Sequence, residues 1–231
     1  MKDKSNVEKV LAETHWNESY RLRKTDHLWG RDPVPFVTKA SKIFRETNCQ
    51  IIADLPCGDG RNTVILAKGL PFVMGLDASQ NALQLAQERI ESEDVRNCVF
   101  QRCDIFQTNF QNEQFDGIFC WDVLGHLKAV NGAMDEIIRI CRKGGRIIGT
   151  LFATSDPNLG SEMIALGENE YLYRDKYYYH FYTRQRVEEF VKRFPVEVLS
   201  LQLEKWGEPA HEGFREYPHE HHSWVFILKK N

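Results

Sequence analysis

Apolar residues along the first two thirds of the chain alternate between short continuous runs and segments with helical spacing. The run 51–55 stops at Pro56, as a buried strand does before a turn. The segment 82–90 carries its apolar residues on one face and follows Ser79, a residue type that caps helices. The pattern predicts helices over 7–14, 36–44, 62–68, 82–90 and 134–141, the last closed by Gly144 and Gly145, and strands over 51–55, 72–76, 98–100, 115–121 and 146–152.

Strands that alternate with helices at this pace indicate βαβ units and a mostly parallel sheet. Right-handed crossovers then give a doubly wound α/β fold. The 231 residues lie within the range of one such domain, so we expect a single domain over 1–231.

The pattern changes after residue 152. Residues 153–182 are polar and aromatic without a clean period, and we interpret them as an insertion. A helix is predicted over 187–194, followed by two strands over 196–203 and 223–228 that are joined by a loop alone. Such strands can pair antiparallel. The apolar run at 224–228 suits a strand buried on both faces, so we expect it between the fifth strand and the strand 196–203. The predicted fold is a seven-stranded, mostly parallel sheet with an antiparallel last strand.

Composition excludes several classes of protein. The net charge of −3 disfavours binding to nucleic acid, and no apolar run approaches the roughly 20 residues that span a bilayer. The N-terminus is charged and lacks the apolar segment of a secretory signal. The six cysteines are scattered and form no CxxC pair, which favours reduced thiols over disulfides or structural zinc. We therefore expect a cytoplasmic protein without contact to membranes.

A glycine turn and three acidic residues stand where strands are predicted to end. Gly58 and Gly60 follow the first strand and let the backbone approach a ligand closely. Asp54, Asp77 and Asp104 end or follow the first three strands. They suit a ligand ammonium, two ribose hydroxyls and an adenine amino group, respectively. Taken alone, Asp77 could be a helix cap and Asp104 a turn residue; the three acids together form a more specific pattern.

This set of motifs resembles the cofactor site of class I methyltransferases, which use S-adenosylmethionine (SAM). Residues 51–62 resemble the glycine motif, 75–79 the ribose motif, 103–105 the adenine motif, 115–122 the fourth-strand motif, and 141–147 the turn before the fifth strand. Pro56 departs from the pattern, since the family usually has its first glycine there. The resemblance implies cofactor binding by Arg31, Asp54, Leu55, Pro56, Cys57, Gly58, Gly60, Asn62, Asp77, Ala78, Asp104, Ile105, Trp121 and Asp122.

A nicotinamide-dependent oxidoreductase is the main rival within this fold. Its Gly-x-Gly-x-x-Gly fingerprint fails here, because Thr63 occupies the third glycine position. Asp54 would also place a negative charge near a pyrophosphate, whereas SAM carries a sulfonium, an ammonium and no phosphate. The acidic strand ends therefore favour SAM.

The segment after the fourth strand bears on the methyl acceptor. Amino-directed nucleic-acid methyltransferases carry Asp/Asn-Pro-Pro-Tyr/Phe there, whereas this chain reads Trp-Asp-Val-Leu-Gly-His over 121–126. With the acidic charge balance, this favours an O, N or S atom of a small molecule. A tRNA or protein methyltransferase and a non-catalytic SAM-binding protein remain alternatives. The protein is expected to be a monomer or a homodimer.

Two aromatic segments are candidates for covering the site. Residues 1–48 are predicted to form a helical cap, with Trp16 and Tyr20 facing the substrate; an ordinary packing helix is the alternative. Within the insertion 153–182, Tyr177 and Tyr178 are candidate substrate contacts in a lid or pocket wall. Alternatively, these rings only cover the edge of the sheet.

Histidines are candidates for proton transfer. His126 follows the fourth strand, and His219, His221 and His222 precede the last strand. We assign catalytic candidacy to His126, His221 and His222 and substrate contact to His219, since imidazole titrates near neutrality. On a strand, His219 and His221 share a face and His222 takes the other. Their spacing permits a metal site, but a structural or substrate-binding role is favoured and no metal is predicted.

Overall fold

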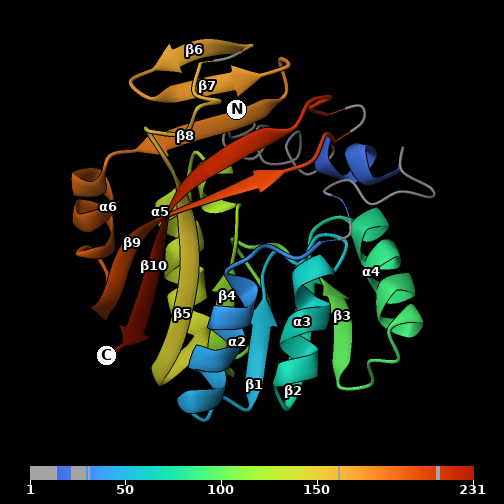
Figure 1. Cartoon of the computed structure of the whole chain (residues 1–231). Helices are drawn as coiled ribbons and strands as arrows, with labels where there is room; N and C mark the ends of the chain where they lie inside the picture. The colour runs from blue at the N-terminus through green and yellow to red at the C-terminus, as the bar shows by residue number, and fades with distance from the viewer. Residues whose placement is uncertain (1–14, 22–29, 31, 161, 212–213) are drawn as a thin grey trace, which may run out of the picture.

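The computed structural model describes residues 15–21, 30, 32–160, 162–211 and 214–231 (Figure 1). The helix expected over 7–14 and the candidate cofactor contact Arg31 lie outside these residues. Residues 15–21 are helical.

Seven strands form the central sheet in the order β3-β2-β1-β4-β5-β10-β9. The first five run parallel, and β10 pairs antiparallel with both β5 and β9. This confirms the predicted fold class and the predicted place of the last strand. The interior of β10 is buried on both faces, with Val225, Phe226 and Leu228 at 0% exposure, as its apolar run required. The strands are β1 Ile51–Asp54, β2 Phe72–Asp77, β3 Cys98–Arg102, β4 Phe115–Cys120, β5 Cys141–Ala153, β9 Val196–Glu208 and β10 His219–Lys230.

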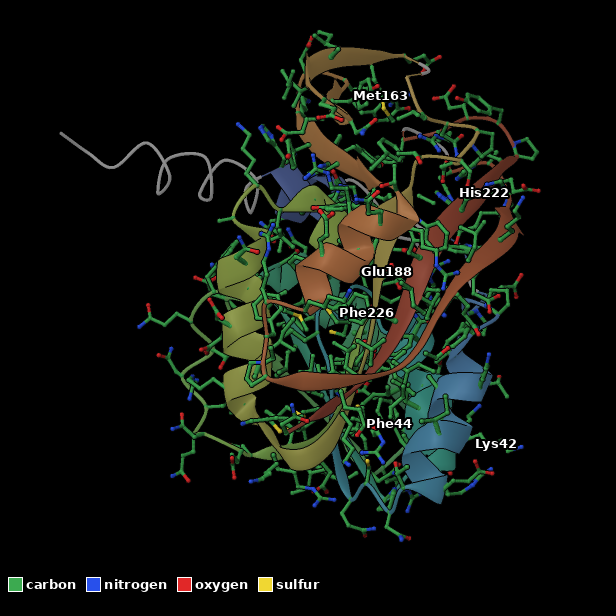
Figure 2. The ribbon with its side chains drawn as sticks, turned by 90° about the vertical axis from the view of Figure 1, so that its left-hand side faces the viewer. Lys42, Phe44, Met163, Glu188, His222 and Phe226 are labelled. Carbon is green, nitrogen blue, oxygen red and sulfur yellow. The ribbon has the colours of Figure 1, made fainter. Side chains whose placement is uncertain are left out.

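Helices cover both faces of this sheet (Figure 1). On one face lie α2 Val37–Glu46, α3 Arg61–Gly69 and α4 Gln80–Ser92. On the other lie α5 Val130–Ile140 and α6 Arg184–Val191. Phe44 of α2 is buried against the sheet, whereas Lys42 points outward (Figure 2). Ser79 caps α4 as expected, its hydroxyl oxygen accepting from the Ala82 amide at 3.1 Å. Among the helices that the structure describes, none is long and apolar enough to cross a membrane.

The end of α5 differs from the prediction. Gly144 and Gly145 do not close this helix, which ends at Ile140 because Cys141 is already extended and pairs with Phe115 of β4. The register between β4 and β5 shifts after that pair, and both glycines lie within the irregularity. A Cβ on Gly145 would come within 2.8 Å of the Asp116 carbonyl oxygen, so the glycine permits a close strand approach.

The insertion is a three-stranded antiparallel sheet at the carboxyl-end side of the central strands (Figure 1). It consists of β6 Met163–Gly167, β7 Glu170–Tyr173 and β8 Tyr177–Tyr182. β8 joins the end of β5 through the parallel pairs Phe152–Phe181 and Ala153–Tyr182. The sequence did not reveal these strands, because β8 carries rings on both faces: Tyr179 and Phe181 are buried, while Tyr178 and His180 are only half-buried.

Candidate functional site

A cavity of about 640 Å³ opens at the carboxyl ends of β1, β2 and β4. Strand-end loops form one side of it, and the helical residues 15–21, the insertion and the connection between β9 and β10 form the other. This is the side of a doubly wound sheet where ligands bind.

The glycine loop between β1 and α3 is attached to the end of β2. Its Gly58 amide donates to Asp77 Oδ2 at 2.9 Å, and Gly60 precedes the first residue of α3 with φ of +79°. Gly58 has φ of +54°, and a Cβ there would lie 2.7 Å from the Tyr20 hydroxyl oxygen. The positive φ angles therefore favour glycine at both positions. At Gly58, a side chain would also collide with Tyr20.

Asp77 connects the loop to the wall of the cavity. Its Oδ1 accepts from the Ser79 amide at 2.9 Å, while Oδ2 holds Gly58. Burial raises its pKa to about 6, although the backbone hydrogen bonds oppose the shift. Each carboxylate oxygen retains accepting capacity. Asp77 is thus suited to hold both the loop and the hydroxyls of a ligand.

Asp54 lies beneath the loop, away from the cavity wall. Its side chain is buried, and Oδ2 accepts from Thr63 Oγ1 at 2.6 Å. Burial raises its pKa to about 7, with the Thr63 hydrogen bond opposing and the Asp77 charge adding to the shift. Asp54 does not line the cavity, so the structure does not place it for the expected direct contact with a ligand ammonium. Gly60 is also absent from the wall, because it begins the helix.

The remaining described cofactor candidates line the cavity. Asp104 reaches it from beyond β3, with Oδ1 accepting from the Phe106 amide at 2.9 Å. Asp122 follows β4 and hydrogen-bonds Thr150; burial raises its pKa to about 6, opposed by His221 and Arg61 and reinforced by Glu208. The candidates on the wall are Leu55, Pro56, Cys57, Gly58, Asn62, Asp77, Ala78, Asp104, Ile105, Trp121 and Asp122.

His126 lies on the cavity wall among aromatic rings. Its Nδ1 is 2.8 Å from the Tyr178 carbonyl oxygen, which can only accept, so Nδ1 carries the proton. Ring centroids of Trp16 and Tyr179 lie 5.2 and 4.4 Å away. Burial lowers the pKa of His126 to about 4, so the ring is neutral at pH 7 and its Nε2 presents a lone pair.

A second polar cluster surrounds Glu208 at the end of β9. Arg61 donates to its Oε1 at 2.9 Å, and His211 Nε2 lies 2.8 Å from its Oε2. Burial opposes ionisation of Glu208, but His211 and Arg61 outweigh it and hold the pKa well below its usual range. His219 and His221 also line the cavity, and one ligand atom each of Glu208, His219 and His221 lie within 4.8 Å of one another. This trio has the composition of a metal site, although Glu208 is already neutralised by its partners.

His222 is not part of the cavity. The alternation of β10 turns its side chain to the opposite face from His221, where Nδ1 lies 3.1 Å from Ser155 Oγ and Nε2 contacts Glu220. Figure 2 shows it on the upper part of β10. The structure therefore does not bring His222 to the cavity wall with the other candidate histidines.

The described part of the N-terminal segment bridges two sides of the cavity. Asn17 Oδ1 accepts from the Ser79 hydroxyl at 2.9 Å, and Ser19 Oγ lies 2.5 Å from the Tyr177 hydroxyl of the insertion. Trp16 and Tyr20 line the cavity, as do Tyr177 and Tyr178. The four aromatic candidates are thus brought together.

Sequence reasoning missed several polar residues of the wall, among them Arg61, Glu208 and Arg215. Arg61 directly follows the glycine loop, and this position in the sequence already marks it as a candidate for the cavity wall. Glu208 and Arg215 belong to the end of β9 and to the connection that follows. The predicted antiparallel last strand already placed this connection over the site, so its charged residues could have been considered.

The comparisons with known proteins agree with this geometry. The family described as "Methyltransferase domain" matches residues 46–194. An uncharacterized methyltransferase of Schizosaccharomyces pombe is 31% identical over 151 residues, 62% of this chain and 49% of the relative. A demethylmenaquinone methyltransferase of Lactiplantibacillus plantarum is 31% identical over 122 residues, 51% of this chain and 50% of the relative. The matched regions span half or less of these relatives.

Solved structures show the same fold. A 1,6-didemethyltoxoflavin-N1-methyltransferase of Burkholderia thailandensis, with bound 1,6-didemethyltoxoflavin and S-adenosylhomocysteine, has a TM-score of 0.71 at 16% identity, covering 98% of this chain and 90% of that one. A SAM-dependent methyltransferase of Anabaena variabilis has a TM-score of 0.68 at 17% identity, covering 96% and 95%. The sheet order and the acid-lined glycine loop are those of the class I, SAM-dependent methyltransferases. The chain belongs to the methyltransferase-domain family.

The residues present fit SAM as the cofactor. Asp77, Asp104 and Asp122 place carboxylates along one part of the cavity, which suits a ligand with a sulfonium and an ammonium. Gly58 keeps the loop open where a Cβ would meet Tyr20.

Proposed function

We propose that this chain transfers the methyl group of SAM to an O, N or S atom of a small molecule. The main support for this proposal is that one continuous cavity includes both the acidic strand ends at Asp77 and Asp104 and an aromatic chamber around His126. The chamber is lined by Trp16, Tyr177 and Phe214, and flat apolar walls suit a small organic acceptor. The small-molecule acceptor bound in the Burkholderia enzyme supports this choice.

SAM supplies an electrophilic methyl group on a sulfonium. The protein contributes orientation and the exclusion of water, because methyl transfer is an in-line displacement. Asp77 and the Gly58 loop hold the cofactor end, and the aromatic chamber confines the acceptor. The lone pair of His126 Nε2 accepts a hydrogen bond from a protonated acceptor atom and so aims that atom.

In this proposal, His126 orients the substrate by accepting a hydrogen bond from it, and it is a weak base. Its pKa of about 4 moves the acid limb of activity well below the pH 6–7 expected for an unperturbed imidazole. An acceptor atom that loses its proton only during the reaction needs no stronger base, since the displacement itself acidifies it.

Residues 15–21 and the insertion serve as the cover of the chamber. Asn17 attaches the segment to the start of α4, and Ser19 attaches it to Tyr177 of β8. Trp16 packs between His126 and Phe214, so the same segment contributes to the wall. We propose these two elements as the cap and the lid of the site.

The test is turnover of a small-molecule panel, containing phenols, amines, thiols and N-heterocycles, with SAM. Release of S-adenosylhomocysteine together with a methylated product is the expected result. A protein that binds SAM but releases no S-adenosylhomocysteine with any panel member, while methylating tRNA or protein substrates or nothing at all, contradicts the proposal.

A further inference from the structure

Arg215 is a buried positive charge on the cavity wall without a counter-charge among the described residues. Arg215 belongs to the connection between β9 and β10, where it forms an antiparallel bridge with His211. It is only 3% exposed and lines the cavity. The bridge, with amide-to-carbonyl distances of 2.6 and 2.8 Å, fixes the backbone from which the guanidinium extends.

Within the described part of the chain, no carboxylate forms an ion pair with Arg215. Its Nε is buried without a hydrogen-bond partner, and its guanidinium lies over the Tyr173 ring, whose centroid is 5.4 Å from Cζ. The other buried arginines differ. Arg61 pairs with Glu208 at 2.9 Å and Arg89 with Asp59 at 3.2 Å. A buried charge without a partner is strongly unfavourable, so the position of Arg215 points to a partner that the described residues do not supply.

Two buried acids of this part of the fold already have partners. Glu208 is held by Arg61 and His211, and Asp156 accepts from the backbone amides of His222 and Asn158. His126 and His219 add no positive charge beside it, because both are neutral: burial lowers the pKa of each, and the positive charge of Arg215 lowers it further.

The rest of the surroundings are aromatic. Phe214 packs edge-on against Tyr173 and Tyr177, with ring centroids 5.5 and 5.0 Å apart. The Tyr173 hydroxyl donates to the Phe214 carbonyl at 2.8 Å, which ties the insertion to the connection that carries Arg215. The guanidinium thus lies among aromatic rings without an ion pair to a described carboxylate, and its planar fork matches a carboxylate.

We infer that Arg215 binds an anionic group, a carboxylate or a similar oxyanion, on a flat apolar methyl acceptor. This rests on the proposed function, since it assigns the substrate class of the same chamber. SAM also carries a carboxylate, so the same chemistry has two sources. The experiment separates them by measuring cofactor binding and anion binding independently.

Calorimetry would compare benzoate with benzamide, a neutral molecule of similar shape, on protein saturated with S-adenosylhomocysteine. We expect the protein to bind benzoate about tenfold more tightly or better, the scale of a charge-assisted hydrogen bond. Arg215→Met should reduce this preference to less than about twofold, and Arg215→Lys should retain part of it. Arg96→Met is the matched control, because Arg96 is 86% exposed, and it should retain the full preference.

The affinity for S-adenosylhomocysteine should change by less than about twofold in Arg215→Met. A tenfold loss of that affinity assigns the carboxylate to the cofactor and overturns the inference. Equal binding of benzoate and benzamide by the unmodified protein also overturns it, and this comparison needs no variant to fold. If the protein prefers benzoate but methylates no panel member, the anion site stands and the proposed function fails.

Discussion

Asp77 gives the sharpest test of the proposed cofactor site, because its carboxylate both holds the glycine loop and faces the cavity. Its oxygens accept the Gly58 and Ser79 amides at 2.9 Å each, and the same carboxylate faces the cavity. Asp77→Ala removes both hydrogen bonds and leaves two backbone donors without their acceptor. It also removes the acceptor for ligand hydroxyls.

The size of the effect follows from these contacts. A lost hydrogen bond to a charged group is worth about 1.5–3 kcal/mol, so S-adenosylhomocysteine should bind about 10–150-fold more weakly to Asp77→Ala. Asp77→Asn keeps one accepting oxygen but turns an NH₂ group toward one of the two amides, and we expect at least a comparable loss. Asp135→Ala, an exposed substitution on α5, is the matched control and should bind normally.

Calorimetry with S-adenosylhomocysteine measures this directly, and circular dichroism verifies folding. Normal affinity in a folded Asp77→Ala protein would refute the assignment of Asp77 to the cofactor site. Tight binding of NAD by the unmodified protein, without binding of S-adenosylhomocysteine, would refute the cofactor itself.

Three further predictions follow from the same geometry. Burial raises the pKa of Asp54 to about 7, so its stabilising contribution is present below the unfolded value near 4 and lost as the pH rises through 7. In urea unfolding at pH 8, Asp54→Asn should therefore have a higher free energy of unfolding than the unmodified protein, by at most about 4 kcal/mol, and the difference should close at pH 5; a difference that does not change with pH would contradict this. His126→Ala should lower kcat/KM by about 10²-fold with little change in SAM affinity, and the unmodified enzyme should show no acid limb between pH 7 and 8, where an unperturbed imidazole would begin to give one; full turnover in the variant would make the ring structural. Dialysis against EDTA should leave turnover unchanged, because Arg61 and His211 already neutralise Glu208, and recovery on adding Zn²⁺ or Mn²⁺ would assign a metal to the trio Glu208, His219 and His221.

The central sheet could be predicted because its hydrophobic pattern is set by burial alone. The continuous apolar run in β10 requires cover on both faces, which only a position between two strands provides. The insertion has no such signal. Its buried rings, such as Tyr179, and its half-buried ring Tyr178 are the same residue type, so the period of two that marks a strand is not visible in the sequence.

The sequence predicted the site residues that stand at the ends of strands. It did not predict residues that reach the site by pairing with a distant segment of the chain. Asp77 and Asp104 stand at strand ends, and topology alone carries them to the cavity. The pair Arg61–Glu208 joins residues 147 positions apart, and neither position is marked locally.

The contrast between the two arginines shows what geometry adds to the sequence. Arg61 and Arg215 are each one of many charged residues in the chain, and both are carried to the same cavity. Only the structure reveals that Glu208 neutralises the first, while no described carboxylate pairs with the second. A sulfonium at the acidic strand ends and an oxyanion at Arg215 would each meet an opposite charge within the same cavity. On the two proposals, opposite charges within one cavity would distinguish the cofactor from the methyl acceptor.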